Sequence, residues 1–217
     1  MGLYRLTIYI GEAVGATDDA TRVKLTPAAS ELRTKAGSLR LWLVVVYTVG
    51  HSTRSLGELV NLLRGWSVET LVDIRSIPRS RKNPQFNADT LPAELAKSGI
   101  RYVHLSALGG LRGKKKTGPS RNLGWQVDAF RNFADYAQTE PFSLGLDELL
   151  TLASQSTCAI MCAEAVWWRC HRRIVADYLL VRGVRVKHVL SEDRAEEAKL
   201  TPFAKRAKSG ALDYHPE

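Results

Sequence analysis

The chain has 217 residues, of which 45% are hydrophobic, and it carries a formal net charge of +9 with a pI of about 9.6. This apolar fraction is enough to build a hydrophobic core, which argues against a largely disordered chain. The positive charge favours anionic partners such as nucleic acid, nucleotides or phosphorylated metabolites, although it serves solubility equally well. Because no apolar run approaches the roughly 20 residues of a membrane helix and the N-terminus lacks a secretory pattern, we expect a cytoplasmic protein without membrane association.

Residues 1–40 mix Gly, Ala, Thr and scattered charges and show little sustained periodicity. We interpret them as an N-terminal extension, with poor order as one reading, and residues 41–217 as a single domain. In this domain, β-rich apolar runs predict strands at 41–49, 68–74, 100–105, 157–162 and 184–190. Helical spacing predicts helices at 56–63, 91–98, 126–138, 146–154 and 170–182.

The first helix carries a recognisable start signal. Ser55 followed three residues later by Glu58 fits a capping box. Strands that alternate with helices imply crossover connections, so the sequence predicts an α/β fold: one Rossmann-like, three-layer domain with a mainly parallel sheet. Neither GxGxxG nor GxxxxGK[ST] occurs, so a classical dinucleotide or P-loop site is unsupported and the cofactor stays unspecified.

Polar residues follow the predicted strands. In open parallel sheets, ligands bind beyond the carboxyl ends of the strands. We therefore expect one shared cleft that gathers His51, Asp73, Arg75, Glu164 and Arg172. If the second strand persists, Asp73 and Arg75 are expected to point to opposite faces.

The segment 162–173 is the richest in reactive side chains. A helix that opens at Cys170 offers free N–H groups and a positive dipole end, and flanking arginines at 169, 172 and 173 favour an anion there. Cys162 and Cys170 are either reactive thiolates or small core residues. The odd number of cysteines, three, argues against a disulfide scaffold and favours free thiols.

Some residues in this segment are also zinc-type ligands. Cys162, Cys170, His171 and Glu164 have suitable side chains. The adjacent Cys-His pair is awkward and the spacing fits no standard chelating motif, so no metal is predicted. Elsewhere, Trp167 and Trp168 either stack on a ligand or cover the core, and the basic loop 109–124 either grips phosphates or is merely solvated.

Several pieces together resemble the family of domains of unknown function numbered 488. The pieces are Tyr47–Thr53, Val72–Arg81 with Phe86, Tyr102, Leu108–Gly110, Met161–Glu164, Cys170–Arg172, His188 and Leu200–Lys205. The resemblance covers about residues 47–216. It implies a Rossmann-like α/β fold and supplies no reaction.

The leading hypothesis is an enzyme that acts on an anionic, phosphate-bearing substrate, such as a nucleotide or nucleic acid. The predicted catalytic residues are Glu164, His51 and Cys162. The predicted substrate-binding residues are Asp73, Arg75, Arg81, Cys170, His171 and Arg172. The alternatives are a non-catalytic nucleic-acid-binding protein and a thiol redox or metal-binding module. The sequence leaves the oligomeric state open.

Overall fold

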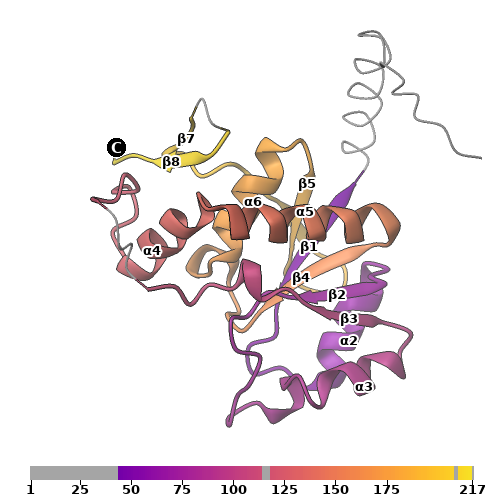
Figure 1. Cartoon of the computed structure of the whole chain (residues 1–217). Coiled ribbons are helices and arrows are strands. Elements are labelled where there is room, and N and C mark those ends of the chain that lie inside the picture. The colour runs from indigo at the N-terminus through magenta and orange to yellow at the C-terminus, as the bar shows by residue number, and fades with distance from the viewer. Residues whose placement is uncertain (1–43, 114–117, 208–209, 217) are drawn as a thin grey trace, which may run out of the picture.

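The computed structural model describes residues 44–113, 118–207 and 210–216 (Figure 1). The extension expected at residues 1–40 lies outside these residues. Within them, no helix combines the length and the apolar character needed to cross a membrane.

A mostly parallel sheet forms the centre of the fold, with strand order β3-β2-β4-β1-β5-β6. The strands are β1 (Val45–Gly50), β2 (Thr70–Asp73), β3 (Arg101–His104), β4 (Cys158–Cys162), β5 (Arg185–Val189) and β6 (Ala195–Glu197). The first five run parallel, and β6 pairs antiparallel with β5. The five predicted strands and the mainly parallel sheet are therefore confirmed.

Helices flank the sheet: α2 (Leu56–Gly65), α3 (Leu91–Ala96), α4 (Asp128–Ala137), α5 (Glu140–Gln155) and α6 (Arg172–Val181) (Figure 1). Residues of β4 alternate between two hydrophobic clusters. Ala159 and Met161 pack with α2 and α3, whereas Ile160 packs with α4, α5 and α6. Because successive side chains of a strand point to opposite faces, the two clusters are the two sides of a three-layer α/β domain.

The predicted capping box is present at the start of α2. The Ser55 N–H donates to Glu58 Oε2 at 2.6 Å, and the Glu58 N–H donates to Ser55 Oγ at 3.2 Å. These reciprocal bonds satisfy N–H groups that a helix start leaves without partners, so α2 begins where the sequence places it.

Three helix starts were predicted wrongly. α4 begins at Asp128, not at 126. α5 begins at Glu140, not at 146, because Pro141 is tolerated in a first helical turn. α6 begins at Arg172 and is preceded by a short 3-10 turn at Trp167–Arg169, so Cys170 lies before the helix.

A C-terminal hairpin was not predicted at all. It pairs β7 (Ala204–Arg206) with β8 (Leu212–Tyr214) and packs near α4 and α6. Buried Asp177 of α6 anchors it, since it accepts from the Thr201 N–H at 2.9 Å and from the Tyr214 hydroxyl at 3.0 Å. Strands of three residues with alternating polar side chains leave little periodicity for a sequence reading to detect.

Candidate functional site

The carboxyl ends of β1, β2 and β4 meet at one edge of the sheet. Gly50 of β1 is in register with Cys162 of β4, and the next N–H, that of His51, donates to the Cys162 carbonyl at 3.0 Å. A side chain at Gly50 would collide with the Glu164 carbonyl. Glycine at position 50 therefore lets the loop after β4 cross the end of β1, which brings two distant segments together.

Asp73 and Arg75 form a buried ion pair at the end of β2. Arg75 Nε lies 2.9 Å from Asp73 Oδ1, and Arg75 Nη2 lies 2.5 Å from Asp73 Oδ2. The expectation that these side chains point to opposite faces was wrong. Residues i and i+2 share a face of a strand, and the chain turns after Asp73 so that the guanidinium folds back onto the carboxylate.

Further hydrogen bonds complete a network around this pair, which we call the Arg75 network: His51, Asp73, Arg75, Tyr102 and the Phe86 carbonyl. Arg75 Nη2 donates to the Phe86 carbonyl at 2.6 Å, and the Tyr102 hydroxyl donates to Asp73 Oδ2 at 2.8 Å. Burial and the Asp73 charge raise the pKa of Tyr102, so this hydroxyl stays protonated and keeps donating. Every polar group named here has a partner, which is how a buried charge is tolerated.

The tautomer of His51 follows from its neighbours. Its Nδ1 lies 2.9 Å from the Ser52 carbonyl, which can only accept, so Nδ1 carries the proton. Its Nε2 then accepts from Arg75 Nη1 at 3.2 Å. Burial, assisted by the Arg75 charge, lowers the pKa of His51 to about 4, so the ring is neutral at physiological pH.

An open pocket of about 360 Å³ lies beside this network. Its polar lining residues are His51, Ser52, Thr53, Arg75, Arg79, Ser80 and Asn83. Sequence reasoning chose Arg81 from the 76–87 loop, but Arg81 is exposed and is not among the lining residues. Arg79, Ser80 and Asn83 were missed, because the sequence of a Pro- and Arg-rich loop does not reveal which of its side chains line a pocket.

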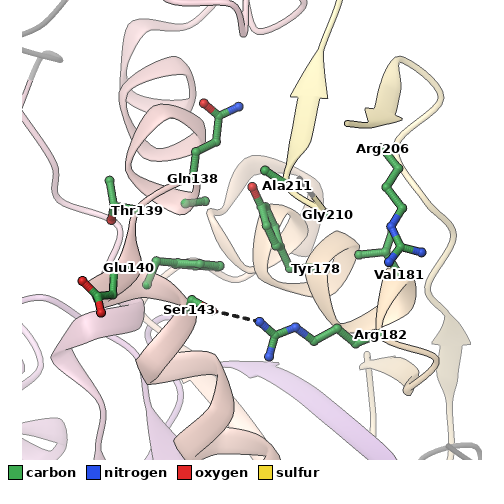
Figure 2. A pocket seen from close by; sticks show the side chains of 12 residues that line it. Gln138, Thr139, Glu140, Ser143, Tyr178, Val181, Arg182, Arg206, Gly210 and Ala211 are labelled. Carbon is green, nitrogen blue, oxygen red and sulfur yellow. Dashed lines mark hydrogen bonds between the residues drawn. The ribbon is translucent and has the colours of Figure 1, made fainter. Parts of the chain in front are cut away.

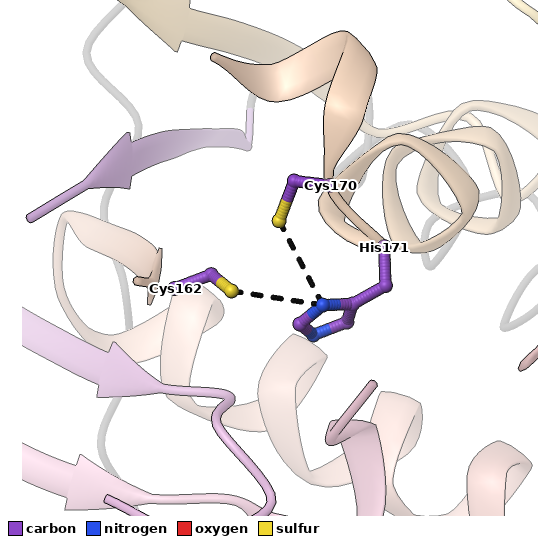
Figure 3. A group of neighbouring side chains, drawn as sticks. All are labelled: Cys162, Cys170 and His171. Carbon is purple, nitrogen blue, oxygen red and sulfur yellow. Dashed lines mark hydrogen bonds between the residues drawn. The ribbon is translucent and has the colours of Figure 1, made fainter. Parts of the chain in front are cut away.

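A second cluster, the thiol cluster, consists of Cys162, Cys170 and His171 (Figure 3). His171 Nδ1 lies 3.6 Å from the Cys162 sulfur and 3.7 Å from the Cys170 sulfur. The opposite ring nitrogen, Nε2, lies 3.1 Å from the Ile74 carbonyl and therefore carries the proton. The two sulfurs thus face the same unprotonated nitrogen.

The two thiols of this cluster differ in acidity. Burial tends to raise the pKa of Cys170, but the hydrogen bond with Cys162 and the Arg172 charge oppose it, and its pKa falls well below the usual value. The hydrogen bond with Cys170, together with burial, raises the pKa of Cys162. The pair therefore favours one thiolate, on Cys170, beside one thiol.

Arg172 does not point to an open anion site. Its side chain is buried, its Nη2 donates to the Glu164 carbonyl at 2.7 Å, and its Nε donates to the Cys170 sulfur at 3.3 Å. Arg173 contacts Thr201 Oγ1 at 3.0 Å and lies over the Trp125 ring. The expected anion site at this helix start thus lacks two of its three arginines, because they stabilise the loop after β4 and the C-terminal segment.

The chain matches one known protein family. Residues 55–179 match the family model described as "Domain of unknown function DUF488", a span of more than half the chain. The chain belongs to the DUF488 family. The match is narrower than the resemblance over residues 47–216, and it leaves His51 just outside. No curated protein and no solved structure matches the chain.

Seven of the nine predicted site residues fall into two groups, and Arg81 and Glu164 belong to neither. The first is the Arg75 network with His51, and the second is the thiol cluster with Arg172. Both groups lie at the same sheet edge, but their side chains do not form one catalytic triad of His51, Cys162 and Glu164. The Glu164 side chain is exposed on the connecting loop, so its catalytic role stays a prediction.

The two tryptophans after β4 differ in their contacts. Trp167 stacks on buried His188 at 4.2 Å between ring centroids, and its Nε1 donates to Glu196 at 3.3 Å. Trp168 is about half exposed. The stacking partner of Trp167 is thus within the chain.

Another cavity, of about 480 Å³, lies between the start of α5, α6 and the C-terminal hairpin (Figure 2). Tyr178, Arg182 and Arg206 line it, and the Arg182 guanidinium donates to Ser143 Oγ at 3.1 Å. None of its lining residues belongs to the strand ends that carry the two polar groups, so this cavity is separate from the candidate site.

Proposed function

We propose that this DUF488 protein is an enzyme that binds a small anionic, phosphate-bearing substrate in the pocket beside the Arg75 network. The pocket lies at the carboxyl ends of parallel strands, where α/β domains place their ligands. Its volume, about 360 Å³, falls in the range of small-molecule sites.

The lining of the pocket carries the proposal. Two guanidinium groups, Arg75 and Arg79, are joined there by hydroxyl and amide groups, and no carboxylate is among the lining residues in the described part of the chain. Arg79 pairs with Asp89 only loosely, at 3.9 Å and with both side chains exposed, so it remains available to a ligand. Guanidinium groups match phosphate oxygens in geometry as well as charge.

The Arg75 network would hold its guanidinium ready for such a ligand. The hydrogen bonds to Asp73, His51 and Phe86 engage four of its five N–H groups and fix its plane. One N–H on Nη1 is left for a phosphate oxygen. His51 then acts as a positioning residue, because its Nε2 lone pair faces Arg75.

For proton transfer, Glu164 is the proposed general acid or base. Its loop crosses the end of β1, and Ala163, one residue earlier, lines the pocket. The Glu164 carboxylate is exposed to solvent next to the pocket lining, so a substrate that extends beyond the pocket would reach it.

Calorimetric titration tests the proposal, with inorganic phosphate and a nucleoside monophosphate as probes of the full chain at low salt. Arg79→Ala should weaken binding at least about tenfold, since one charge-assisted hydrogen bond contributes about 1.5–3 kcal/mol. Arg121→Ala removes an arginine that is also exposed but lies outside the pocket, and it should leave phosphate binding unchanged.

The same variants separate small-molecule binding from polyanion binding. If the chain is a nucleic-acid-binding protein, both variants should weaken binding to duplex DNA to a similar extent. Absence of phosphate binding, or equal loss in both variants, contradicts the proposal. If a phosphate ester is turned over, Glu164→Gln should abolish turnover and leave phosphate binding intact.

A further inference from the structure

We infer that the thiol cluster binds a zinc ion through Cys162 Sγ, Cys170 Sγ and His171 Nδ1. These three ligand atoms lie within 4.8 Å of one another, although they come from a strand end and from the two residues that precede a helix (Figure 3). The site goes beyond the proposed function and does not depend on it, because no residue of the thiol cluster lines the phosphate pocket.

The first argument is the hydrogen-bonding capacity of His171. Its Nε2 donates to the Ile74 carbonyl, which leaves a single lone pair on Nδ1. Figure 3 shows both sulfurs directed at this one nitrogen, at 3.6 and 3.7 Å. With Cys170 as a thiolate, only the Cys162 thiol has a proton that it could donate to this lone pair, whereas a cation at the centre of the three atoms would satisfy all of them.

The second argument is metric. Tetrahedral zinc holds thiolate sulfur at about 2.3 Å and imidazole nitrogen at about 2.0–2.1 Å, which separates the sulfur from the nitrogen by about 3.6 Å. Both sulfur–nitrogen distances in the thiol cluster have this length. The obstacle seen in the sequence, an adjacent Cys-His pair, disappears because Cys170 and His171 turn their ligand atoms to the same point.

The third argument is the surroundings of the ligands. Metal-bound histidines usually donate their other N–H to a carbonyl or carboxylate, as His171 does to Ile74. The edge of its ring meets Phe133 at 5.0 Å between centroids, and a side chain at Gly110 would collide with the ring. The imidazole is therefore held in place before any ion arrives.

Arg172 provides the fourth argument, through its need for a negative partner. Its guanidinium is buried, and in the described residues no carboxylate lies within 4 Å of it. Its Nε instead donates to the Cys170 sulfur at 3.3 Å. Metal binding would hold this sulfur as a thiolate, which would give the buried guanidinium the negative partner that it otherwise lacks.

The ligand set indicates the class of ion. Two sulfurs and one imidazole suit zinc better than Mg²⁺ or Ca²⁺, which prefer oxygen ligands. Glu164 was also considered as a ligand from the sequence, but its carboxylate is not part of the group. Three protein ligands leave a fourth position for water or a substrate, as in catalytic zinc sites.

Zinc titration of the full chain tests this inference. Protein that has been reduced and stripped of metal is titrated with Zn²⁺ in competition with a chromophoric chelator. The wild type should take up one equivalent, and Cys170→Ser should bind it at least about tenfold more weakly. Cys158→Ser is the matched control. Cys158 is a buried cysteine at the start of β4, the strand that ends at Cys162, and its sulfur lies outside the thiol cluster, so this variant should bind zinc like the wild type.

Two further readouts keep the inference falsifiable if Cys170→Ser does not fold. Zn²⁺ should raise the melting temperature of the wild type and of Cys158→Ser, and a chelator should reverse the shift. Co²⁺ should give the wild type a thiolate-to-metal absorption band. Failure of the reduced wild type to bind zinc, or equal zinc affinity in Cys170→Ser, overturns the site; a Cys162–Cys170 disulfide with no zinc uptake after reduction does so too. Phosphate titration is read separately, so either proposal can fail alone.

Discussion

Two polar groups sit at the same sheet edge, and they differ in how fully their members are satisfied. In the Arg75 network, the Asp73 carboxylate, the guanidinium and the His51 ring have partners of matching charge or hydrogen-bond type. In the thiol cluster, two sulfurs share one nitrogen lone pair. A network in which every polar group has a partner, which we call saturated, stabilises the fold and orients a binding group. A cluster whose groups lack partners can still bind a ligand.

The largest effect is expected when the saturated network is broken. Asp73→Asn removes the negative partner of buried Arg75 and should lower the free energy of unfolding by about 3–5 kcal/mol, the cost of leaving a buried charge unpaired. Urea denaturation monitored by circular dichroism measures it. Tyr102→Phe, which removes only the neutral donor to Asp73, should cost less, about 1.5–3 kcal/mol, the contribution of one hydrogen bond to a charged group. A similar loss in both variants would mean that the ion pair adds nothing special.

A somewhat smaller effect is expected from pH. Burial lowers the pKa of both His51 and His188 from 6.5 to about 4. Between these values the unfolded chain takes up protons that the folded chain does not, so stability falls as pH drops below about 6.5, by up to about 3 kcal/mol for each histidine. Asp177 has its pKa raised to about 6 by burial and acts in the opposite sense between pH 6 and 4, so it offsets part of this loss.

Unfolding experiments at several pH values between 7 and 4.5 check this expectation. His51→Gln should reduce the loss of stability at low pH by about the contribution of one histidine. His188→Gln should do the same, although His188 lies outside the Arg75 network and contacts Thr48. If stability stays constant over this range in the wild type, the two rings are not held neutral by burial.

The smallest effect is expected from crowding the thiol cluster. Gly110→Ala places a methyl group against the His171 ring and should cost about 1–3 kcal/mol, since the ring must move in a packed site. Gly113→Ala, in the same loop but with open space around the added carbon, should stay within about 0.5 kcal/mol. Thermal or urea unfolding compares the two. Equal stabilities would show that the ring yields freely and is not held in place.

The sequence predicted the fold more completely than it predicted the site. Buried strands such as β4 read as unbroken apolar runs, and the Ser55–Glu58 pair marks a helix start by local chemistry alone. Patterns of this kind depend on neighbouring residues, which the sequence displays directly. The hairpin β7–β8 depends instead on a hydrogen bond to Asp177, which is distant in the chain, so no local sequence pattern predicted it.

Within the site, the edge of the sheet could be predicted, but the grouping of side chains could not. His51 follows β1, whose neighbour in the sheet is β4, yet its side chain meets Arg75, which follows β2 on the far side of β4; this contact depends on how the loops after the strands turn, which is a long-range property. The zinc-type geometry was likewise hidden, because the chain between Cys162 and Cys170 includes a 3-10 turn whose path the spacing does not reveal. Catalytic roles for Glu164 and Cys162 remain predictions.

The strand order also constrains how the chain is able to fold during its synthesis. β4 lies between β1 and β2 and pairs with both, although it is made long after them. Until residue 162 leaves the ribosome, the segments of β1 and β2 cannot reach their final spacing, and each lacks a neighbour on that side. Contacts so distant in sequence make folding slow and expose strand edges to aggregation, so a nascent chain paused before β4 would be an expected substrate for chaperones.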